Sequence, residues 1–167
     1  GLPAFLLSGI KVVSVCPDTM ELGYVQRGLI NRKFRAVPDK PWVAFLQDYV
    51  TDAYKDIYVS PGNELLWVIK DLRIGERSFA VNEKAYVRLK ATAYYSEDKE
   101  HYRLLTNFDT ILIHNGFDVT DKHGRQIAEA IQTLYAACAD NIGRDTSGEL
   151  VTEASIISKA QGEFSYP

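Results

Sequence analysis

The order of apolar and polar residues along the chain predicts a strand, a helix, three consecutive strands and a second helix. The first strand covers residues 11–15, a β-branched run that stops at a turn signal. In both predicted helices, near residues 41–57 and 120–140, apolar residues recur at steps of three and four. The stripe of the first helix is Trp42, Phe45, Leu46, Tyr49, Val50, Ala53 and Ile57, and that of the second is Ile127, Ala130, Ile131, Leu134, Tyr135 and Cys138.

The three middle strands have different patterns. Residues 64–74 begin with a continuous apolar run, as expected of a strand covered on both faces, and Gly75-Glu76 allows a break or bulge after it. Residues 83–95 alternate, with Ala85, Val87, Leu89, Ala91 and Ala93 on one face and Tyr86, Arg88, Lys90, Thr92 and Tyr94 on the other. In residues 102–114 we expect Leu105, Ile111 and Ile113 on one side and Leu104, Phe108 and Leu112 on the other.

Consecutive strands between helices predict the α+β class. We expect a mixed or antiparallel sheet of about four strands in the order β-α-β-β-β-α, with both helices packed on one face. Residues 1–143 are interpreted as a single domain, and the polar residues 144–167 as an extended arm or a linker. Tyr24-Val25 and Leu29-Ile30 are candidate short edge strands.

Composition and charge narrow the possible functions. The chain has 167 residues, 46% of them hydrophobic and 25% charged, which is typical of a globular domain. A net charge of -3 argues against a general nucleic-acid binder. The one basic run, Arg32-Lys33-x-Arg35, is interpreted as a solvated loop or an edge strand. The longest apolar run, residues 65–69, is far too short to span a membrane.

Neither the cysteines nor the first residues indicate a reactive site or a targeting signal. Cys16 and Cys138 are interpreted as buried free thiols, with a disulfide between them as the alternative. The apolar start lacks a preceding positive region, so it does not resemble an intact signal peptide. Val15 and Lys11 also rule out a lipid-attachment motif around Cys16.

Motifs for catalysis are missing from the sequence. It contains no phosphate-binding glycine loop, no GxSxG and no HExxH, and its three histidines lack metal-ligand spacing, so we expect no metal and no cofactor. Asp118, Asp121 and His123 cluster where the second helix begins. They are interpreted as favourable charges near the helix dipole, with Thr120 as the cap, or alternatively as an acid–base pair.

Five residues are candidates for binding. Asp71 and Arg73 share one strand face, where they either contact a polar ligand or partner, or form a cross-strand salt bridge. Tyr86 and Tyr94 alternate with Arg88 and other basic residues on the polar face of their strand. This pattern is typical of a protein or glycan contact surface, unless residues 18–40 or the C-terminal arm cover it.

A resemblance to a known group of proteins follows from three stretches and the helix after them. These are residues 65–74 (LLWVIKDLRI), 85–91 (AYVRLKA) and 108–110 (FDT), followed by the capped amphipathic helix. Over residues 11–140 the chain resembles small bacterial cell-envelope accessory lipoproteins, including the auxiliary lipoproteins of ABC-type transport systems and the related TolB amino-terminal-like fold. The resemblance implies an exported, membrane-tethered protein without an active site, although the lipid-bearing cysteine is absent.

The sequence therefore predicts a non-catalytic binding or assembly module of the bacterial cell envelope, periplasmic or associated with the outer membrane, and otherwise cytoplasmic. Its expected partner is a protein of the envelope, with a second copy of the chain as a further candidate. The predicted binding residues are Tyr86, Tyr94, Arg88, Asp71 and Arg73. The alternative is a small hydrolase or transferase that uses the Asp118, Asp121 and His123 cluster, with Asp71 and Arg73 as further candidates.

Overall fold

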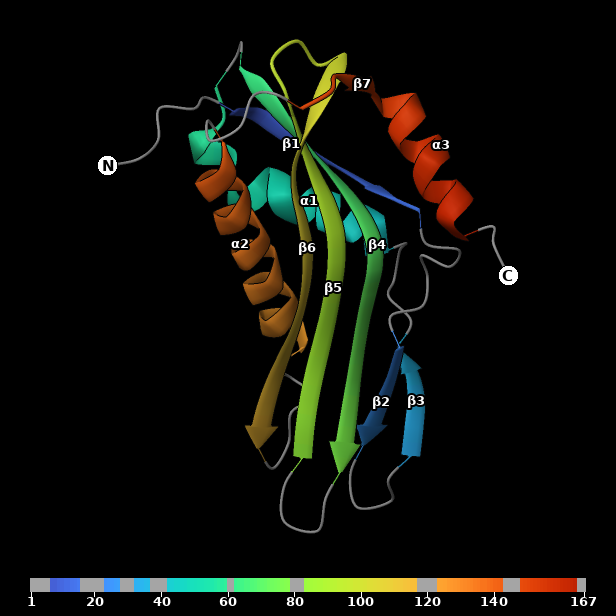
Figure 1. Cartoon of the computed structure of the whole chain (residues 1–167). Coiled ribbons are helices and arrows are strands. Elements are labelled where there is room, and N and C mark those ends of the chain that lie inside the picture. The colour runs from blue at the N-terminus through green and yellow to red at the C-terminus, as the bar shows by residue number, and fades with distance from the viewer. Residues whose placement is uncertain are drawn as a thin grey trace.

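The computed structural model describes residues 7–15, 23–27, 32–36, 42–59, 62–78, 83–116, 123–142 and 148–164. These residues confirm the α+β class and the mixed sheet (Figure 1). The strands are β1 (Leu7–Ser14), β2 (Gly23–Arg27), β3 (Arg32–Ala36), β4 (Asn63–Ser78), β5 (Glu83–Ser96), β6 (His101–Gly116) and β7 (Val151–Thr152). The helices are α1 (Trp42–Ala53), α2 (His123–Asn141) and α3 (Glu153–Phe164), with a 3₁₀ turn η1 (Lys55–Ile57) after α1.

The prediction of about four strands and two helices was too low, because short elements flank the predicted ones. The described strands form one sheet of seven, and α3 is a third helix. β2 contains the predicted Tyr24-Val25, while Leu29-Ile30 lies outside the described residues. The basic run lies in β3, which forms the outermost strand, so the edge-strand interpretation is confirmed.

β4 is the central strand of the sheet, and two different strands share its outer edge. β1 pairs in parallel with its first half, from Asn63 to Ile69, and β2 pairs in parallel with Ile74 and Gly75. On its other edge β4 pairs antiparallel with β5 along nearly its whole length. The irregularity lies at Lys70, where the β4–β5 register shifts, and the break predicted at Gly75-Glu76 is wrong because β4 continues through it.

β5 and β6 form a long antiparallel hairpin, and β6 contains a bulge. Ala93 pairs with Thr106 but Tyr94 pairs with Leu104, so Leu105 is the extra residue. A bulge reverses the side on which later residues point. Leu104 therefore shares a face with Ile111 and Ile113, whereas Leu105 packs on the main core, so the sides predicted for these two leucines are wrong.

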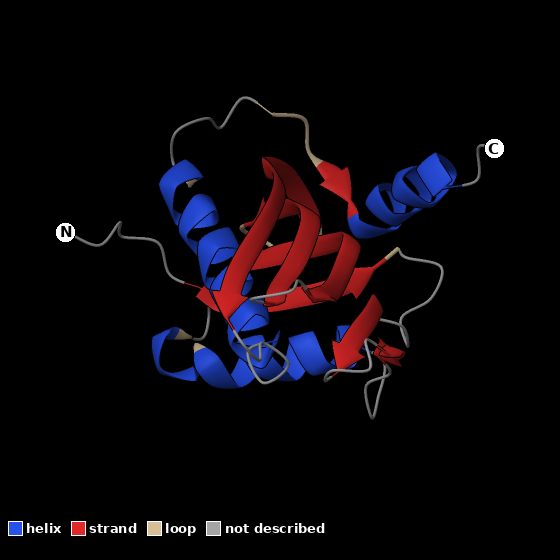
Figure 2. Ribbon diagram, turned by 90° about the horizontal axis from the view of Figure 1, so that it is seen from below, coloured by secondary structure: helices blue, strands red, loops and turns tan. Residues whose placement is uncertain are grey.

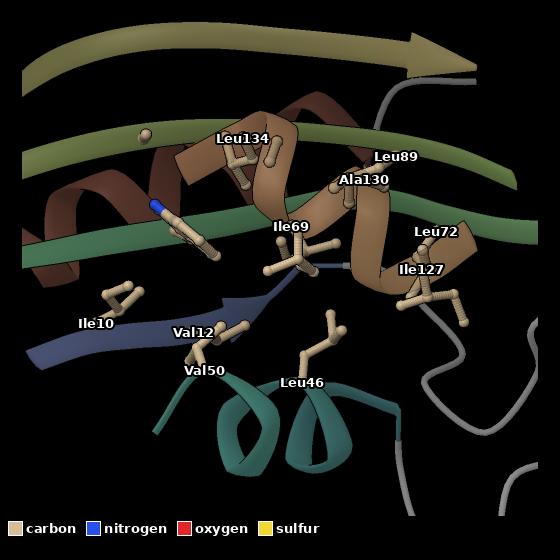
Figure 3. Packing of buried hydrophobic residues seen from close by; sticks show 14 of the residues in the cluster. Ile10, Val12, Leu46, Val50, Ile69, Leu72, Leu89, Ile127, Ala130 and Leu134 are labelled. Carbon is tan, nitrogen blue, oxygen red and sulfur yellow. The ribbon is translucent and has the colours of Figure 1, made fainter. Parts of the chain in front are cut away.

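The main core lies between one face of the sheet and the helices α1 and α2. Figure 3 shows Leu46 and Val50 of α1 pointing toward Val12 and Ile69, with residues of α2 approaching the same region. The alternation in β5 is confirmed, because its five predicted core residues are buried here (Ala85, Val87, Leu89, Ala91 and Ala93). The predicted burial of Phe45 is wrong: it is 45% exposed, since the stripe that α1 buries is only Trp42, Leu46 and Val50.

Cys138 lies in this core as a free thiol. Burial raises its pKa to about 12, and the neighbouring Trp67 indole offsets this slightly. Such a thiol is unreactive at neutral pH, as predicted for a buried cysteine. Cys16, Asp39 and Thr120 lie outside the described residues.

A second, smaller core lies on the opposite face of the sheet, beneath α3. Residues 144–167 were expected to be an extended arm or a linker, but within them α3 packs with Ile156 and Ala160 on Leu66, Val68 and Tyr102. Figure 2 shows α1 and α2 together on one side of the curled sheet and α3 apart from them on the other. The continuous apolar run of β4 is thereby explained, because its residues alternate between the two cores and every one is fully buried.

None of the helices within the described residues is long and apolar enough to cross a membrane.

Candidate binding surface

The face of β4, β5 and β6 that points away from α1 and α2 is here called the outer face. Residues opposite each other in an antiparallel pair project from the same side of the sheet. The outer face therefore consists of cross-strand rows, each with one residue from each strand. α3 lies over the rows at one end, which we call the covered half, and the rows at the other end form the open half.

The open half contains three rows. They are Gly75–Tyr86–Ile113, Arg73–Arg88–Ile111 and Asp71–Lys90–Asp109, and a further row, Arg77–Lys84–Asn115, follows at the end of the strands. Four of the five predicted binding residues lie here: Asp71 and Arg73 on β4, and Tyr86 and Arg88 on β5. The prediction that Asp71 and Arg73 share one strand face is confirmed.

Tyr94, the fifth predicted residue, lies in the covered half. It is half-buried, pairs with Leu66 and Leu104, and packs on the core beneath α3. The two tyrosines of β5 are therefore separated, and they have different surroundings. The polar face of β5 was expected to be either an exposed contact surface or covered by another segment. The C-terminal segment covers Tyr94, whereas Tyr86 is exposed.

Four charged residues of the open half form a chain of ion pairs across the three strands. The Nε of Arg73 lies 3.0 Å from Oδ1 of Asp71, and the Nε of Arg88 lies 3.9 Å from the other oxygen of Asp71. Arg88 also donates to Asp109, with 3.1 Å between Nη2 and Oδ2. Asp71 thus forms a cross-strand salt bridge with Arg88, as one interpretation predicted, whereas Arg73 pairs with Asp71 within the same strand.

The chain of ion pairs affects how a partner meets this surface. The hydrogen bond to Asp109, together with the negative charges of Asp109 and Asp71, raises the pKa of Arg88 above its usual value. The guanidinium therefore stays charged at any physiological pH. The two arginines alternate with the two carboxylates, and Lys84 and Lys90 lie on the same face. The open half therefore carries an excess of positive charge, and its apolar side chains lie beside that charge.

Tyr86 is placed by a glycine on the neighbouring strand. A Cβ atom added at Gly75 would lie 2.2–2.5 Å from atoms of the Tyr86 ring, so the ring lies directly over the glycine. Such aromatic cover of a strand glycine fixes the ring against the sheet and limits its freedom. The ring nevertheless remains 40% exposed, which leaves one side available to another molecule.

Ile111 and Ile113 complete the apolar part of the open half, and their role was not predicted from the sequence. They are 56% and 60% exposed, the highest values among the large apolar side chains described as exposed. Both sides of residues 102–114 are rich in apolar residues, so alternation alone does not reveal which side faces the solvent. The pairing with the polar positions Arg88 and Tyr86 of β5 would have revealed it.

The covered half has a shallow hollow beside α3, with a volume of about 330 Å³. Lys70 and Lys159 border it, and Thr92 donates a hydrogen bond from its hydroxyl to Oδ1 of Asn107 in its wall, at 3.0 Å. Its apolar lining comes from residues such as Val68 and Ile156. Among the described residues that line this hollow there is no carboxylate, imidazole or thiol.

The residues proposed for the enzymatic alternative are not brought together by the described part of the chain. Asp118 and Asp121 lie outside the described residues, and of His123 only the backbone at the start of α2 is described. His101 pairs with Asp98, with 2.9 Å between Nδ1 and Oδ2. Among the residues with described positions, no three metal-binding side chains gather into a possible metal site.

No protein-family model matches this chain, and a search of curated proteins finds no significant relative. The resemblance to envelope lipoproteins thus stays a prediction.

Proposed function

We propose that the chain is a non-catalytic binding or assembly module of the bacterial cell envelope, and that its protein partner docks on the open half of the outer face. One observation carries the proposal. Tyr86, Ile111 and Ile113 form an exposed apolar strip on adjacent strands, at 40%, 56% and 60% exposure, beside the ion-pair chain of Arg73, Asp71, Arg88 and Asp109.

The chemistry of the open half fits a protein partner. Aromatic residues and arginine are enriched at the centres of protein interfaces, and aromatic anchors often carry most of the binding energy. The Tyr86 ring already rests on Gly75, so docking immobilises little additional side-chain freedom. Because the ion pairs exist before binding, a partner meets a surface whose two carboxylates are already paired.

The shape of the open half also favours a macromolecule over a small ligand. Small-molecule sites are concave and enclose most of their ligand. In the described part of the chain the open half is a sheet surface with protruding side chains, and the hollow beside α3 lies in the covered half, away from Tyr86. The envelope location rests on the resemblance described above, and the partner is proposed to be a protein of that compartment.

A site-specific photo-crosslinking experiment tests this proposal. A photoreactive amino acid is placed at Ile111 or, as the matched control, at Leu104, which is 51% exposed on the same face of the same strand. The Ile111 probe is expected to give a defined adduct in envelope fractions, which mass spectrometry identifies, and the Leu104 probe is not. Adding Tyr86→Ser should reduce the adduct at least about tenfold, the effect expected of an aromatic anchor.

The enzymatic alternative makes the opposite prediction for two variants. Asp118→Asn, Asp121→Asn and His123→Gln, combined in one chain, should leave the adduct intact. If that variant folds normally but loses the adduct and the cellular phenotype, while Tyr86→Ser behaves like the wild type, the binding-module proposal is wrong.

A further inference from the structure

We propose that a second copy of this chain pairs antiparallel with the C-terminal part of β6, so that the sheets of the two copies become continuous across a twofold axis at Leu112. This inference goes beyond the proposed function, because it concerns the strand edge and the oligomeric state. The edge adjoins the open half, and the tests below separate the two proposals.

The first argument is that β6 has an open edge. Its outer edge pairs with β7 only at His101 and Tyr102. No other strand in the described part of the chain pairs with that edge, which leaves it open from Arg103 onward. Figure 1 shows that β6 continues past the N-terminal end of α2. The C-terminal part of β6 therefore projects beyond the helix that packs beside it. A strand edge of this kind presents backbone N–H and C=O groups to any strand that approaches.

The second argument is that this edge lacks the features that usually prevent pairing. Natural edge strands are protected by proline, by lysine or by charges that point toward an approaching strand. Between Leu104 and Ile113 there is no proline and no lysine, and the single charged residue is Asp109. Its carboxylate is already bound by Arg88 on β5, which reduces its repulsion of a second copy.

The third argument is that the edge is complementary to itself. When the twofold axis passes through Leu112, Ile111 of each copy lies opposite Ile113 of the other, and four exposed isoleucines meet at the centre. Asp109 then lies opposite Asn115 of the second copy. An axis at Asp109 would set the two carboxylates opposite each other, and an axis at Ile111 would set Asp109 opposite Ile113. The Leu112 axis therefore combines apolar contact with the least unfavourable charge.

Self-pairing also accounts for the exposure of Ile111 and Ile113. β-Branched residues opposite each other on adjacent strands stabilise a sheet, and their burial removes apolar surface from water. A symmetric interface uses the same surface twice, so each isoleucine gains an apolar neighbour at its side while its outer surface stays accessible. Tyr86 lies one strand further in, and it remains open to a different partner.

Sedimentation equilibrium of the full chain tests the oligomeric state. We expect a reversible dimer in the micromolar to submillimolar range. Ile111→Lys combined with Ile113→Lys should weaken dimerisation at least about tenfold, because four charges then meet at the axis. Leu104→Lys is the matched control, since Leu104 is similarly exposed on β6 but lies outside the paired segment. This control should dimerise like the wild type, and circular dichroism verifies that each variant folds.

Cysteine crosslinking tests the register. Ile111→Cys and Ile113→Cys are made as separate variants, and each alone should form little dimer on mild oxidation. A mixture of the two should give a disulfide-linked dimer at least about tenfold more efficiently, because only the mixed pair is placed opposite. The unmodified chain, with Cys16 and the buried Cys138, controls for the native thiols.

Three results would overturn this inference: a monomer at all concentrations, a dimer that survives the two lysines, or crosslinking by a single variant alone. None of them affects the photo-crosslinking adduct that depends on Tyr86. Conversely, a normal dimer whose Ile111 probe gives an adduct only with the second copy, and none with another protein, would contradict the proposed function alone.

Discussion

The covered half and the open half of the outer face are built from the same three strands, yet they differ in what lies over them. In the covered half Leu66, Val68 and Tyr102 are at most 2% exposed, because α3 packs on them. In the open half Tyr86, Ile111 and Ile113 are 40–60% exposed. The comparison shows that an apolar residue on this sheet stabilises the fold only where the chain supplies its own cover, and elsewhere it is available to another molecule.

The two halves also differ in how their polar groups are used. In the covered half the hydroxyl of Tyr102 donates to Glu64 at 2.8 Å, and burial together with this carboxylate raises the pKa of Tyr102. In addition, Lys11 of β1 and Glu153 of α3 form an ion pair at 2.8 Å. These contacts fix α3 and the hairpin in place, whereas the ion pairs of the open half connect only neighbouring strands.

The largest effect is expected when one apolar residue of each half is truncated. Leu66→Ala should lower the free energy of unfolding by about 2–5 kcal/mol, because it leaves a cavity beneath α3. Ile111→Ala should change it by less than about 0.5 kcal/mol, as is usual for surface positions. Urea melts at a concentration where the chain is monomeric measure both. Equal losses would mean that the open half is also covered by the chain itself.

An intermediate effect is expected from Gly75 and Tyr86. Gly75→Ala should cost about 1 kcal/mol, because the new methyl group displaces the Tyr86 ring from the sheet. In a Tyr86→Ser background the same change should cost nothing, or stabilise β4 slightly, since alanine is less flexible than glycine. A double-mutant cycle measures the coupling. Additive losses would show that the ring does not rest on Gly75.

The smallest effect concerns the hairpin at the end of the covered half. The carboxylate of Asp98 accepts hydrogen bonds from His101 and Glu100, which holds its pKa below the usual value, and it raises the pKa of His101 above 6.5. The Asp98–His101 pair stabilises the hairpin fully only when Asp98 is charged and His101 is protonated. Its contribution is therefore lost as the pH rises through the raised pKa of His101, and again in strong acid.

Asp98→Asn should return the pKa of His101 toward 6.5, as followed by the NMR shifts of the imidazole protons during a titration. The side chains of the open half should keep their shifts throughout. An unchanged pKa of His101 in this variant would contradict the pairing.

Much of the fold could be predicted from the sequence because long periodic segments dominate it. The stripe of α2, the alternation of β5 and the doubly buried start of β4 all lie where the pattern placed them. Such patterns arise directly from burial on one face or on two. The short β3 and β7 carry too few residues to establish a period.

The remaining features depend on contacts between distant segments. α3 buries little more than Ile156 and Ala160, so its sequence is nearly as polar as a loop, and only the apolar surface of Leu66 and Val68 makes it a packed helix. The bulge at Leu105 is likewise set by pairing with β5. The open half was found in part, through Tyr86, Arg88, Asp71 and Arg73, but its isoleucines could be recognised only from the register.

The late position of α3 in the chain has a consequence for biosynthesis. A ribosome releases β4, β5 and β6 before it has made the helix that covers Leu66 and Val68. At about 5–20 residues per second, the segment from Gly116 to Phe164 takes roughly 2–10 seconds to synthesise. Throughout that interval the nascent sheet exposes apolar residues along the whole of its outer face, and not only at Tyr86, Ile111 and Ile113. The growing chain is therefore more prone to aggregation than the finished protein, and its need for a chaperone is greatest before α3 emerges.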